Sequence, residues 1–220
     1  MLFDIDGTLI RRAGAHHRQA LVDAVRRTVG IETTTEGVPV AGMLDGDILV
    51  TMMTRAGMKP AAIRKAMPKV IEHAQSIYCR TSPVLARKVC PGVRRVLGRL
   101  QRRGIVTGLV TGNLTRIGWR KMERAGLRPY FRFGAFAELA KDRAGLVRIA
   151  IRHARRQGWI GRDTSISLVG DHPNDVRAAK ANGIRAVAVA TGLVTIDELK
   201  LHSPDVLLPD LRSFALEMLF

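Results

Sequence analysis

The second half of the chain alternates short apolar runs with helical patterns, and this alternation restricts the fold more than any other feature. Strands are expected at residues 105–110, 131–136, 165–169 and 186–190, and helices at residues 92–103, 114–125, 144–157 and 174–182. Strands and helices that alternate at this spacing form a parallel sheet with helices on both faces. A last apolar run predicts an edge strand at 205–208, followed by a helix near 213–219. The predicted fold class is therefore α/β, a doubly wound parallel sheet.

The part of the chain before residue 90 has a different pattern. A buried strand over residues 2–6 ends in a loop at Gly7. Apolar positions at helical spacing then predict three helices, at residues 15–29, 47–56 and 61–78. We therefore expect two domains, an α/β core of residues 1–12 and 85–220 and a helical insertion of residues 13–84. Because the first strand begins at residue 2, a native start upstream of Met1 stays open.

Length and composition are those of an ordinary globular protein. With 220 residues, of which 46% are hydrophobic and 25% charged, the chain can bury a core and has no signature of a disordered or fibrous protein. No apolar run approaches the roughly 18 residues that span a bilayer, and acids stand where a signal peptide would be basic. Two cysteines are too few for a disulfide framework. We expect a cytoplasmic protein with reduced thiols.

The chain is strongly basic, because 36 Lys and Arg residues against 19 Asp and Glu residues give a net charge of +17. This charge suggests nucleic-acid binding as one hypothesis. However, the basic residues are mostly arginines spread along the chain, and only 5% of the residues are aromatic, which leaves few platforms for base stacking. A basic surface also attracts small phosphorylated anions. We therefore expect no membrane partner and rank nucleic acid below a small phosphorylated ligand.

Polar side chains gather where the predicted strands end, and ligands of doubly wound sheets bind outside the carboxyl ends of the strands. The first strand is followed by Asp4 and Asp6, the second by Thr111, Gly112 and Asn113, the third by Glu138 and Lys141, and the fourth by Asp171 and Asp175. Apolar packing does not require such residues. The sequence therefore predicts a site at this edge of the sheet.

These residue types suit phosphoryl transfer. The carboxylate of Asp4 can attack phosphorus, while Asp6 can donate a proton to the leaving oxygen and later take one from water. Because an anionic nucleophile repels an anionic phosphate, a hard cation is needed, and Mg²⁺ prefers oxygen ligands. Asp171 supplies a further acid for this ion, and Asp175, one helical turn later, is a ligand or orients one.

The phosphate itself needs hydrogen-bond donors and positive charge. Thr111 can donate to a phosphoryl oxygen, and Lys141 can neutralise charge on the nucleophile and the phosphate. Gly7 permits a turn that a side chain would block. We assign phosphate binding to Gly7, Thr111, Gly112, Asn113 and Lys141. Either Thr111 or Asn113 could also cap the helix at 114–125, and we expect this role of Asn113.

In this order and at these strand ends, the motifs resemble those of the haloacid dehalogenase-like hydrolase superfamily. The residues concerned are Asp4-Ile5-Asp6-Gly7-Thr8, Thr111-Gly112-Asn113, Lys141, and the run from Gly170 to Asp175. The resemblance covers essentially the whole chain and implies a Rossmann-like core, a helical cap after the first motif, an aspartyl-phosphate mechanism and Mg²⁺. It implies Asp4 as nucleophile and metal ligand, Asp6 as acid/base and metal ligand through its carbonyl, and Asp171 as metal ligand.

Three details refine the resemblance. The acid Asp6 is similar to that of phosphatases and phosphomutases, whereas dehalogenases and phosphonate-cleaving members lack an acid there. Residues 42–48 resemble the G-x-T-D-x-x-I loop of the phosphoglycolate-phosphatase-like subgroup, with Leu44 in place of Thr. The third motif reads Lys141-Asp142-Arg143-Ala144 where K-P-x-P is common, so its cation is either Lys141 or Arg143.

The expected function is Mg²⁺-dependent hydrolysis of a small phosphate monoester, such as phosphoglycolate, a sugar phosphate or a nucleotide. The cap would close over the site to select the substrate and exclude water. A phosphomutase of the same superfamily is the nearest alternative, and a basic nucleic-acid-binding protein without catalysis is the alternative of another class. Of the neighbouring histidines, we expect His17 at a solvated helix start, while His172 either shapes its loop or binds a ligand.

Overall fold

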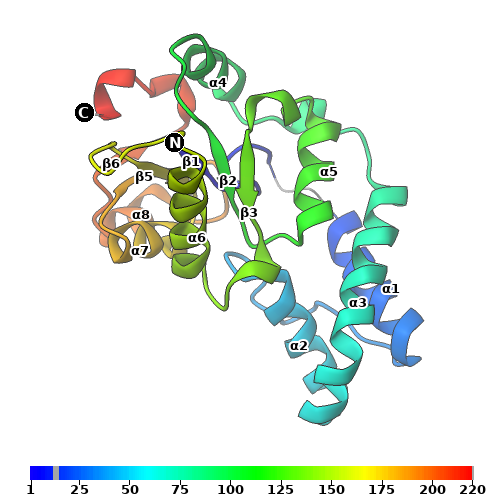
Figure 1. Ribbon diagram of the computed structural model, residues 1–220. Coiled ribbons are helices and arrows are strands. Elements are labelled where there is room, and N and C mark those ends of the chain that lie inside the picture. The colour runs from blue at the N-terminus through cyan, green and yellow to red at the C-terminus, as the bar shows by residue number, and fades with distance from the viewer. Residues whose placement is uncertain (12–14, 220) are drawn as a thin grey trace.

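The computed structural model describes residues 1–11 and 15–219 (Figure 1). In this part of the chain, one parallel sheet has the strand order β3-β2-β1-β4-β5-β6. Its strands are β1 Leu2–Phe3, β2 Gly108–Val110, β3 Phe133–Ala135, β4 Ser167–Gly170, β5 Arg185–Val189 and β6 Val206–Leu208. The register places Leu2 opposite Gly108 on one side and Leu168 on the other. The predicted doubly wound α/β fold is confirmed, with β1 inside the sheet.

Helices cover both faces of the sheet. They are α4 Val93–Arg102, α5 Thr115–Ala125, α6 Arg143–Arg156, α7 Pro173–Ala181 and α8 Ile196–Leu201. Successive residues of β1 point to opposite faces, and both are buried: Leu2 packs in a cluster with Leu146 of α6, whereas Phe3 packs in a cluster with Leu97 of α4 and Met122 of α5. Burial of both faces explains why these strands are continuous apolar runs.

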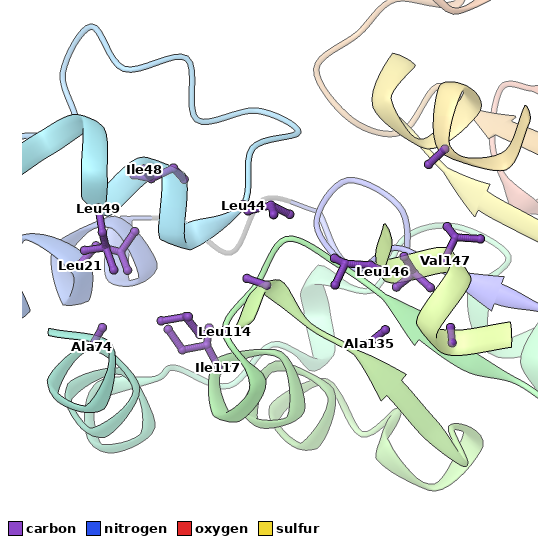
Figure 2. Close-up of a cluster of buried hydrophobic side chains, with 14 of the residues drawn as sticks. Leu21, Leu44, Ile48, Leu49, Ala74, Leu114, Ile117, Ala135, Leu146 and Val147 are labelled. Carbon is purple, nitrogen blue, oxygen red and sulfur yellow. The ribbon is translucent and has the colours of Figure 1, made fainter. Parts of the chain in front are cut away.

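A group of three helices lies beside the sheet, as Figure 1 shows: α1 Ala15–Val29, α2 Asp45–Arg55 and α3 Pro60–Thr81. We call these three helices the helical unit. They pack on one another through buried side chains such as Leu21, Met52 and Val70. Leu114 and Ile117 of the core point toward Leu21 and other apolar side chains of the helical unit in Figure 2. The proposed domain boundary after residue 12 lies outside the described residues.

The structure differs from the expected elements at the C-terminal end. Helix α8 was not predicted, although Thr195 and Glu198 form a capping box at its start. The helix expected near residues 213–219 is wrong, because two 3₁₀ turns, Leu211–Ser213 and Leu216–Leu219, stand there. Between them, Phe214 has an extended backbone and buries its ring in the core beneath α4. Burial of this ring interrupts the helical path.

No helix in the described ranges has the length and the apolar character needed to cross a membrane.

Candidate active site

A cavity of about 180 Å³ opens at the carboxyl edge of the sheet, between the core and the helical unit. The core lines it with Asp4, Asp6, Thr111, Asn113, Arg143 and Asp171, and the helical side lines it with His17, Arg18, Val40, Met43, Asp45 and Ile48. The cavity therefore lies where the strand ends were expected to converge, and it is closed on one side by the predicted insertion.

Three buried carboxylates lie close together at this edge of the sheet, and two of them, Asp4 and Asp171, line the cavity. Asp4, Asp171 and Asp175 each offer an oxygen atom, and these atoms lie within 4.8 Å of one another. Asp4 directly follows β1, and its backbone N–H donates to the carbonyl of Val169 at 2.9 Å. Asp171 directly follows β4, while Asp175 lies in the first turn of α7 and accepts the backbone N–H of His172 at 3.2 Å. Adjacent strands β1 and β4 thus bring the acids together.

The backbone at Gly7 and Gly192 lies very close to the carboxylate of Asp171. The hydroxyl of Thr8 donates to Oδ1 of Asp171 at 2.8 Å. A Cβ atom added at Gly7, which has a φ of +89°, would lie 2.1 Å from Oδ2 of Asp171, and one added at Gly192 would lie 1.7 Å from the same oxygen. Gly7 therefore both makes the turn and leaves room for the carboxylate.

A buried arginine faces these acids. Nη1 of Arg143 lies 2.9 Å from Oδ1 of Asp4 and 3.1 Å from Oδ1 of Asp175. Helix α6 begins at Arg143 because Asp142 caps it, accepting the backbone N–H of Gly145 at 2.7 Å. This start leaves Lys141 exposed and outside the residues that line the cavity. Of the two cations left open by the third motif, the structure brings Arg143 to Asp4 and does not bring Lys141 there.

The charges of this cluster do not balance. Burial, and after it the charges of Asp4 and Asp175, raises the pKa of Asp171 well above its usual value. Burial also raises the pKa of Asp175 to about 7, although the charge of Arg143 opposes this. If all three were ionised, these carboxylates beside one guanidinium would carry excess negative charge, and oxygen donors of this kind suit a hard cation. The residues present therefore fit Mg²⁺.

Asp6 lies across the cavity in a polar network. Its Oδ2 accepts Nδ2 of Asn113 at 2.8 Å and Nζ of Lys121 at 2.5 Å. Nδ2 of Asn113 is also 2.7 Å from the hydroxyl oxygen of Thr111, which is fully buried at the end of β2. Burial would raise the pKa of Asp6, but the charge and hydrogen bond of Lys121 lower it below the usual value. The network thus favours the carboxylate form of Asp6.

The expected cap role of Asn113 is wrong. At the start of α5, the backbone N–H of Leu114 donates to Oδ2 of Asp45 at 2.9 Å, and that of Thr115 donates to the carboxylate of Glu138 at 3.0 Å. The backbone N–H of Arg116 donates to Oε1 of Gln75 at 2.7 Å, so residues from three other segments satisfy free N–H groups of the helix. The side chain of Asn113 is left to contact Asp6.

The helical unit reaches this network through His17. Its Nδ1 lies 3.1 Å from Nζ of Lys121, and its Nε2 lies 3.0 Å from Oδ2 of Asp45. Only 15% of the His17 side chain is exposed, so the expected solvated position is wrong. His172 shapes its loop, because its Nδ1 accepts the backbone N–H of Asn174 at the start of α7.

The chain matches a known protein family over most of its length. The family of haloacid dehalogenase-like hydrolases matches residues 1–189. The chain belongs to this family. This match confirms the predicted family, and with it the prediction that the protein is an enzyme of this class.

Curated relatives of this haloacid dehalogenase-like chain are phosphatases by name. The phosphoglycolate phosphatase of Pectobacterium atrosepticum is 26% identical, with 94% of this chain and 87% of the relative covered. The phosphoglycolate phosphatase of Synechococcus elongatus is 28% identical over 72% of this chain and 69% of the relative. The prediction of a phosphatase of this family agrees with these relatives.

Solved structures share the fold of this haloacid dehalogenase-like hydrolase. β-Phosphoglucomutase from Clostridium difficile has a TM-score of 0.74 at 16% identity and covers 98% of this chain and 92% of its own. CbbY from Rhodobacter sphaeroides, solved with phosphate, has a TM-score of 0.70 at 21% identity and covers 99% of this chain and 97% of its own. The likeness extends over the helical unit as well as the sheet, because it covers nearly the whole chain.

The sequence analysis of this hydrolase missed Lys121, although a signal was present. The buried residues of α5 are Ile117, Gly118, Lys121, Met122 and Ala125, which lie on one face of the helix. A lysine among apolar positions on a core-facing stripe must find acceptors inside the protein. The same reasoning applies to His17, which lies four residues before the buried Leu21 of α1.

Proposed function

We propose that this hydrolase is a cytoplasmic, Mg²⁺-dependent phosphatase of small phosphate monoesters that acts through an aspartyl phosphate on Asp4. The observation that carries the proposal is the pairing of buried Asp4 with Arg143 in a cavity that Asp6 and Asp171 also line, with Asp175 beside Asp4 and Asp171. A nucleophile, an acid/base group and a cation site thus share one enclosed space. The cavity volume of about 180 Å³ suits a small substrate.

In the first proposed step, a carboxylate oxygen of Asp4 attacks phosphorus, and the bond from phosphorus to the leaving oxygen breaks. This step requires the protonated form of Asp6, although Lys121 favours its carboxylate form in the free protein. The protonated Asp6 gives its proton to that oxygen, so the leaving group departs as an alcohol. In the second step, Asp6 takes a proton from water while the water oxygen attacks phosphorus. The bond between phosphorus and Asp4 then breaks, which releases inorganic phosphate and restores the Asp4 carboxylate.

Other residues of the cavity hold the reacting groups. Arg143 fixes Asp4 and opposes the negative charge that gathers there, which makes it the proposed cation of the third motif. Thr111 and Asn113, with the backbone at Gly7 and Gly112, are the proposed phosphate contacts. Lys141 lies outside this group.

Asp4, Asp171 and the backbone carbonyl of Asp6 are the proposed holders of Mg²⁺, with Asp175 orienting Asp4 through Arg143. Bound there, the ion would neutralise charge between the nucleophile and the phosphate.

The helical insertion of residues 13–84 is the proposed cap, and its loop before α2 closes the cavity. The backbone N–H of Asp45 donates to the carbonyl of Gly112 at 2.8 Å, and Nδ2 of Asn174 donates to the carbonyl of Gly42 at 2.8 Å. A Cβ atom at Gly112 would lie 2.3 Å from the carbonyl oxygen of Met43. This close contact between the loop and the core supports selection of the leaving group by the cap. The curated relatives make phosphoglycolate the first substrate to test.

The test is release of inorganic phosphate from phosphoglycolate, sugar phosphates and nucleotides, with and without Mg²⁺. We expect Mg²⁺-dependent release by the wild type, loss of release in Asp4→Asn, and unchanged release in Asp163→Asn, which alters an exposed acid outside the cavity. Transfer of the phosphoryl group to a sugar hydroxyl, without free phosphate, would identify a phosphomutase instead. No reaction with any ester would overturn the proposal.

A further inference from the structure

Lys121 is a fully buried cation on the core-facing side of α5. An ammonium group has three donors and no acceptor, and a buried charge without partners is costly. Three acceptors surround Nζ of Lys121: Oδ2 of Asp6 at 2.5 Å, Oδ1 of Asn113 at 2.5 Å and Nδ1 of His17 at 3.1 Å. The three contacts use all donors of the group. The position of Asp6 is therefore tied to Lys121 and to what holds Lys121.

The contact with His17 continues through the helical unit. Because the ammonium group can only donate, Nδ1 of His17 is the acceptor, and the ring proton lies on Nε2. Nε2 faces Oδ2 of Asp45 at 3.0 Å, and this oxygen also accepts the backbone N–H of Leu114 at 2.9 Å. The hydrogen bonds thus run from Lys121 through α1 and α2 back to the start of α5. Together with the chain of α5 between Leu114 and Lys121, they form a closed ring that links the helical unit to the core.

The third helix of the unit joins at the same place. The ring of Tyr78 on α3 lies 6.0 Å from Nζ of Lys121, and it meets the His17 ring edge-on at a centroid distance of 5.6 Å. Tyr78 is itself fully buried. Beside this polar ring, Leu114 and Ile117 of the core point toward Leu21 in the apolar contact of Figure 2. Lys121 therefore contacts α1 and α3 directly and reaches α2 through His17.

We propose that Lys121 is a positioning residue that places Asp6 in the cleft when the helical unit is docked on α5, with His17 as the link between the two. This inference rests on the proposed function, in which Asp6 exchanges protons with the leaving group and water. Asp6 itself is held by Asn113 and Lys121, which both belong to the core. Opening of the helical unit would remove His17 from Nζ of Lys121 and leave the ammonium group that holds Asp6 with two contacts in place of three. The acid/base group would thus be held most firmly in the closed cleft.

The first test is Lys121→Met, which keeps most of the length of the side chain and removes its charge. The matched control is Lys65→Met, which changes an exposed lysine of α3. We expect kcat to fall about 100-fold in Lys121→Met, the size of effect that misplacing a catalytic group has, while KM stays within about threefold. A wild-type kcat, or a loss confined to KM, would overturn the proposal.

The second test keeps Lys121 and removes the link. His17→Ala should lower kcat by about tenfold. This loss is smaller than that of Lys121→Met, because Lys121 still holds Asp6 but is itself less firmly placed. If both residues act on Asp6 through one ring, Lys121→Met combined with His17→Ala should be no slower than Lys121→Met alone. Losses that multiply in the double variant would show two independent roles and contradict the proposal.

A measurement without turnover separates this inference from the proposed function. Nitrogen-15 NMR of the imidazole should show the Nε2–H form of His17 in the wild type and in Lys65→Met, and a mixture of forms in Lys121→Met. An unchanged His17 signal in Lys121→Met would overturn the ring. If the wild type hydrolyses no ester, the proposed function fails, and this signal alone decides whether the ring exists.

Discussion

Nη1 of Arg143 lies 2.9 Å from Oδ1 of Asp4, and both side chains are buried. The same guanidinium nitrogen lies 3.1 Å from Asp175, so one cation holds the proposed nucleophile and an acid of α7 together. Burial would lower the pKa of Arg143, but the charges of Asp175 and Asp4 raise it, so the group stays charged. Arg143 therefore both orients Asp4 and limits the repulsion among the acids.

This pairing gives the first prediction. Arg143→Met should reduce kcat/KM at least about 100-fold, because it removes a fixed positive charge from the reacting centre. It should also lower the free energy of unfolding by about 3–5 kcal/mol, since Asp4 and Asp175 lose a buried partner. Lys141→Met, two residues away and exposed, should leave both quantities near those of the wild type. Equal losses in the two variants, measured by steady-state kinetics and urea unfolding, would refute this assignment.

The acidic cluster leads to a prediction about Mg²⁺. Asp171→Asn keeps an acceptor for Thr8 but removes an acid whose ionised form is opposed by burial and by the charges of Asp4 and Asp175. Without Mg²⁺ the variant should melt a few degrees above the wild type, about the shift that 1 kcal/mol produces in a domain of this size. The rise in melting temperature on adding Mg²⁺ should be present in the wild type and lost in Asp171→Asn. An equal Mg²⁺ response in both proteins would place the ion elsewhere.

Gly192 provides a steric test of the same site. A Cβ atom there would overlap Oδ2 of Asp171 at 1.7 Å, so Gly192→Ala should displace the carboxylate and weaken the Mg²⁺ response of the melting temperature. Gly46→Ala is the matched control, because a Cβ atom in α2 meets nothing within 4 Å. This control should gain up to about 1 kcal/mol, since alanine favours a helix over glycine. Gly192→Ala with a full Mg²⁺ response would show that Asp171 does not bind the ion.

Much of the fold followed from spacing in the sequence. The alternation after Pro91 predicted the parallel sheet, and the helix expected at 15–29 coincides with α1. Six-residue α8 was missed because so short an element shows little periodicity, and only its capping box marks it. Local patterns thus predicted the strands and the long helices well and missed the short helix.

The site was predictable where residues directly follow strands. Asp4, Asp6 and Asp171 could be placed because the carboxyl ends of parallel strands meet at one edge. Lys121 and His17 come from helix interiors, and their meeting depends on how the helical unit docks on α5, which no local pattern states. Arg143 and Lys141 could not be separated because the decision depends on where α6 begins, and the cap at Asp142 sets that residue.

The two cysteines should differ in reactivity. Cys90 is buried, and burial raises the pKa of its thiol to about 11, whereas Cys79 is half-buried. Native protein at pH 8 should therefore be alkylated at Cys79 before Cys90, because the thiolate is the reactive form. Peptide mapping after timed exposure to iodoacetamide measures the order, and faster labelling of Cys90 would contradict it.

The raised pKa of Cys90 also affects stability in alkali. Its stabilising contribution is complete below the unfolded pKa near 9 and is lost as the pH rises through about 11, because the unfolded chain releases the proton first. Urea unfolding between pH 8 and pH 11 should show a decline in the free energy of unfolding that is smaller in Cys90→Ala. An equal decline in the variant would assign the alkaline loss to other groups.

The central claim is that Asp4 carries the phosphoryl group between the two steps. Asp6→Asn with p-nitrophenyl phosphate tests it, because this leaving group departs without a proton donor while the second step still needs Asp6 as a base. We expect a burst of one nitrophenol per enzyme, followed by slow turnover, and a phosphoryl group on the peptide that contains Asp4 after acid quenching. A quenched enzyme that carries no phosphoryl group, or carries it on another residue, would contradict the account.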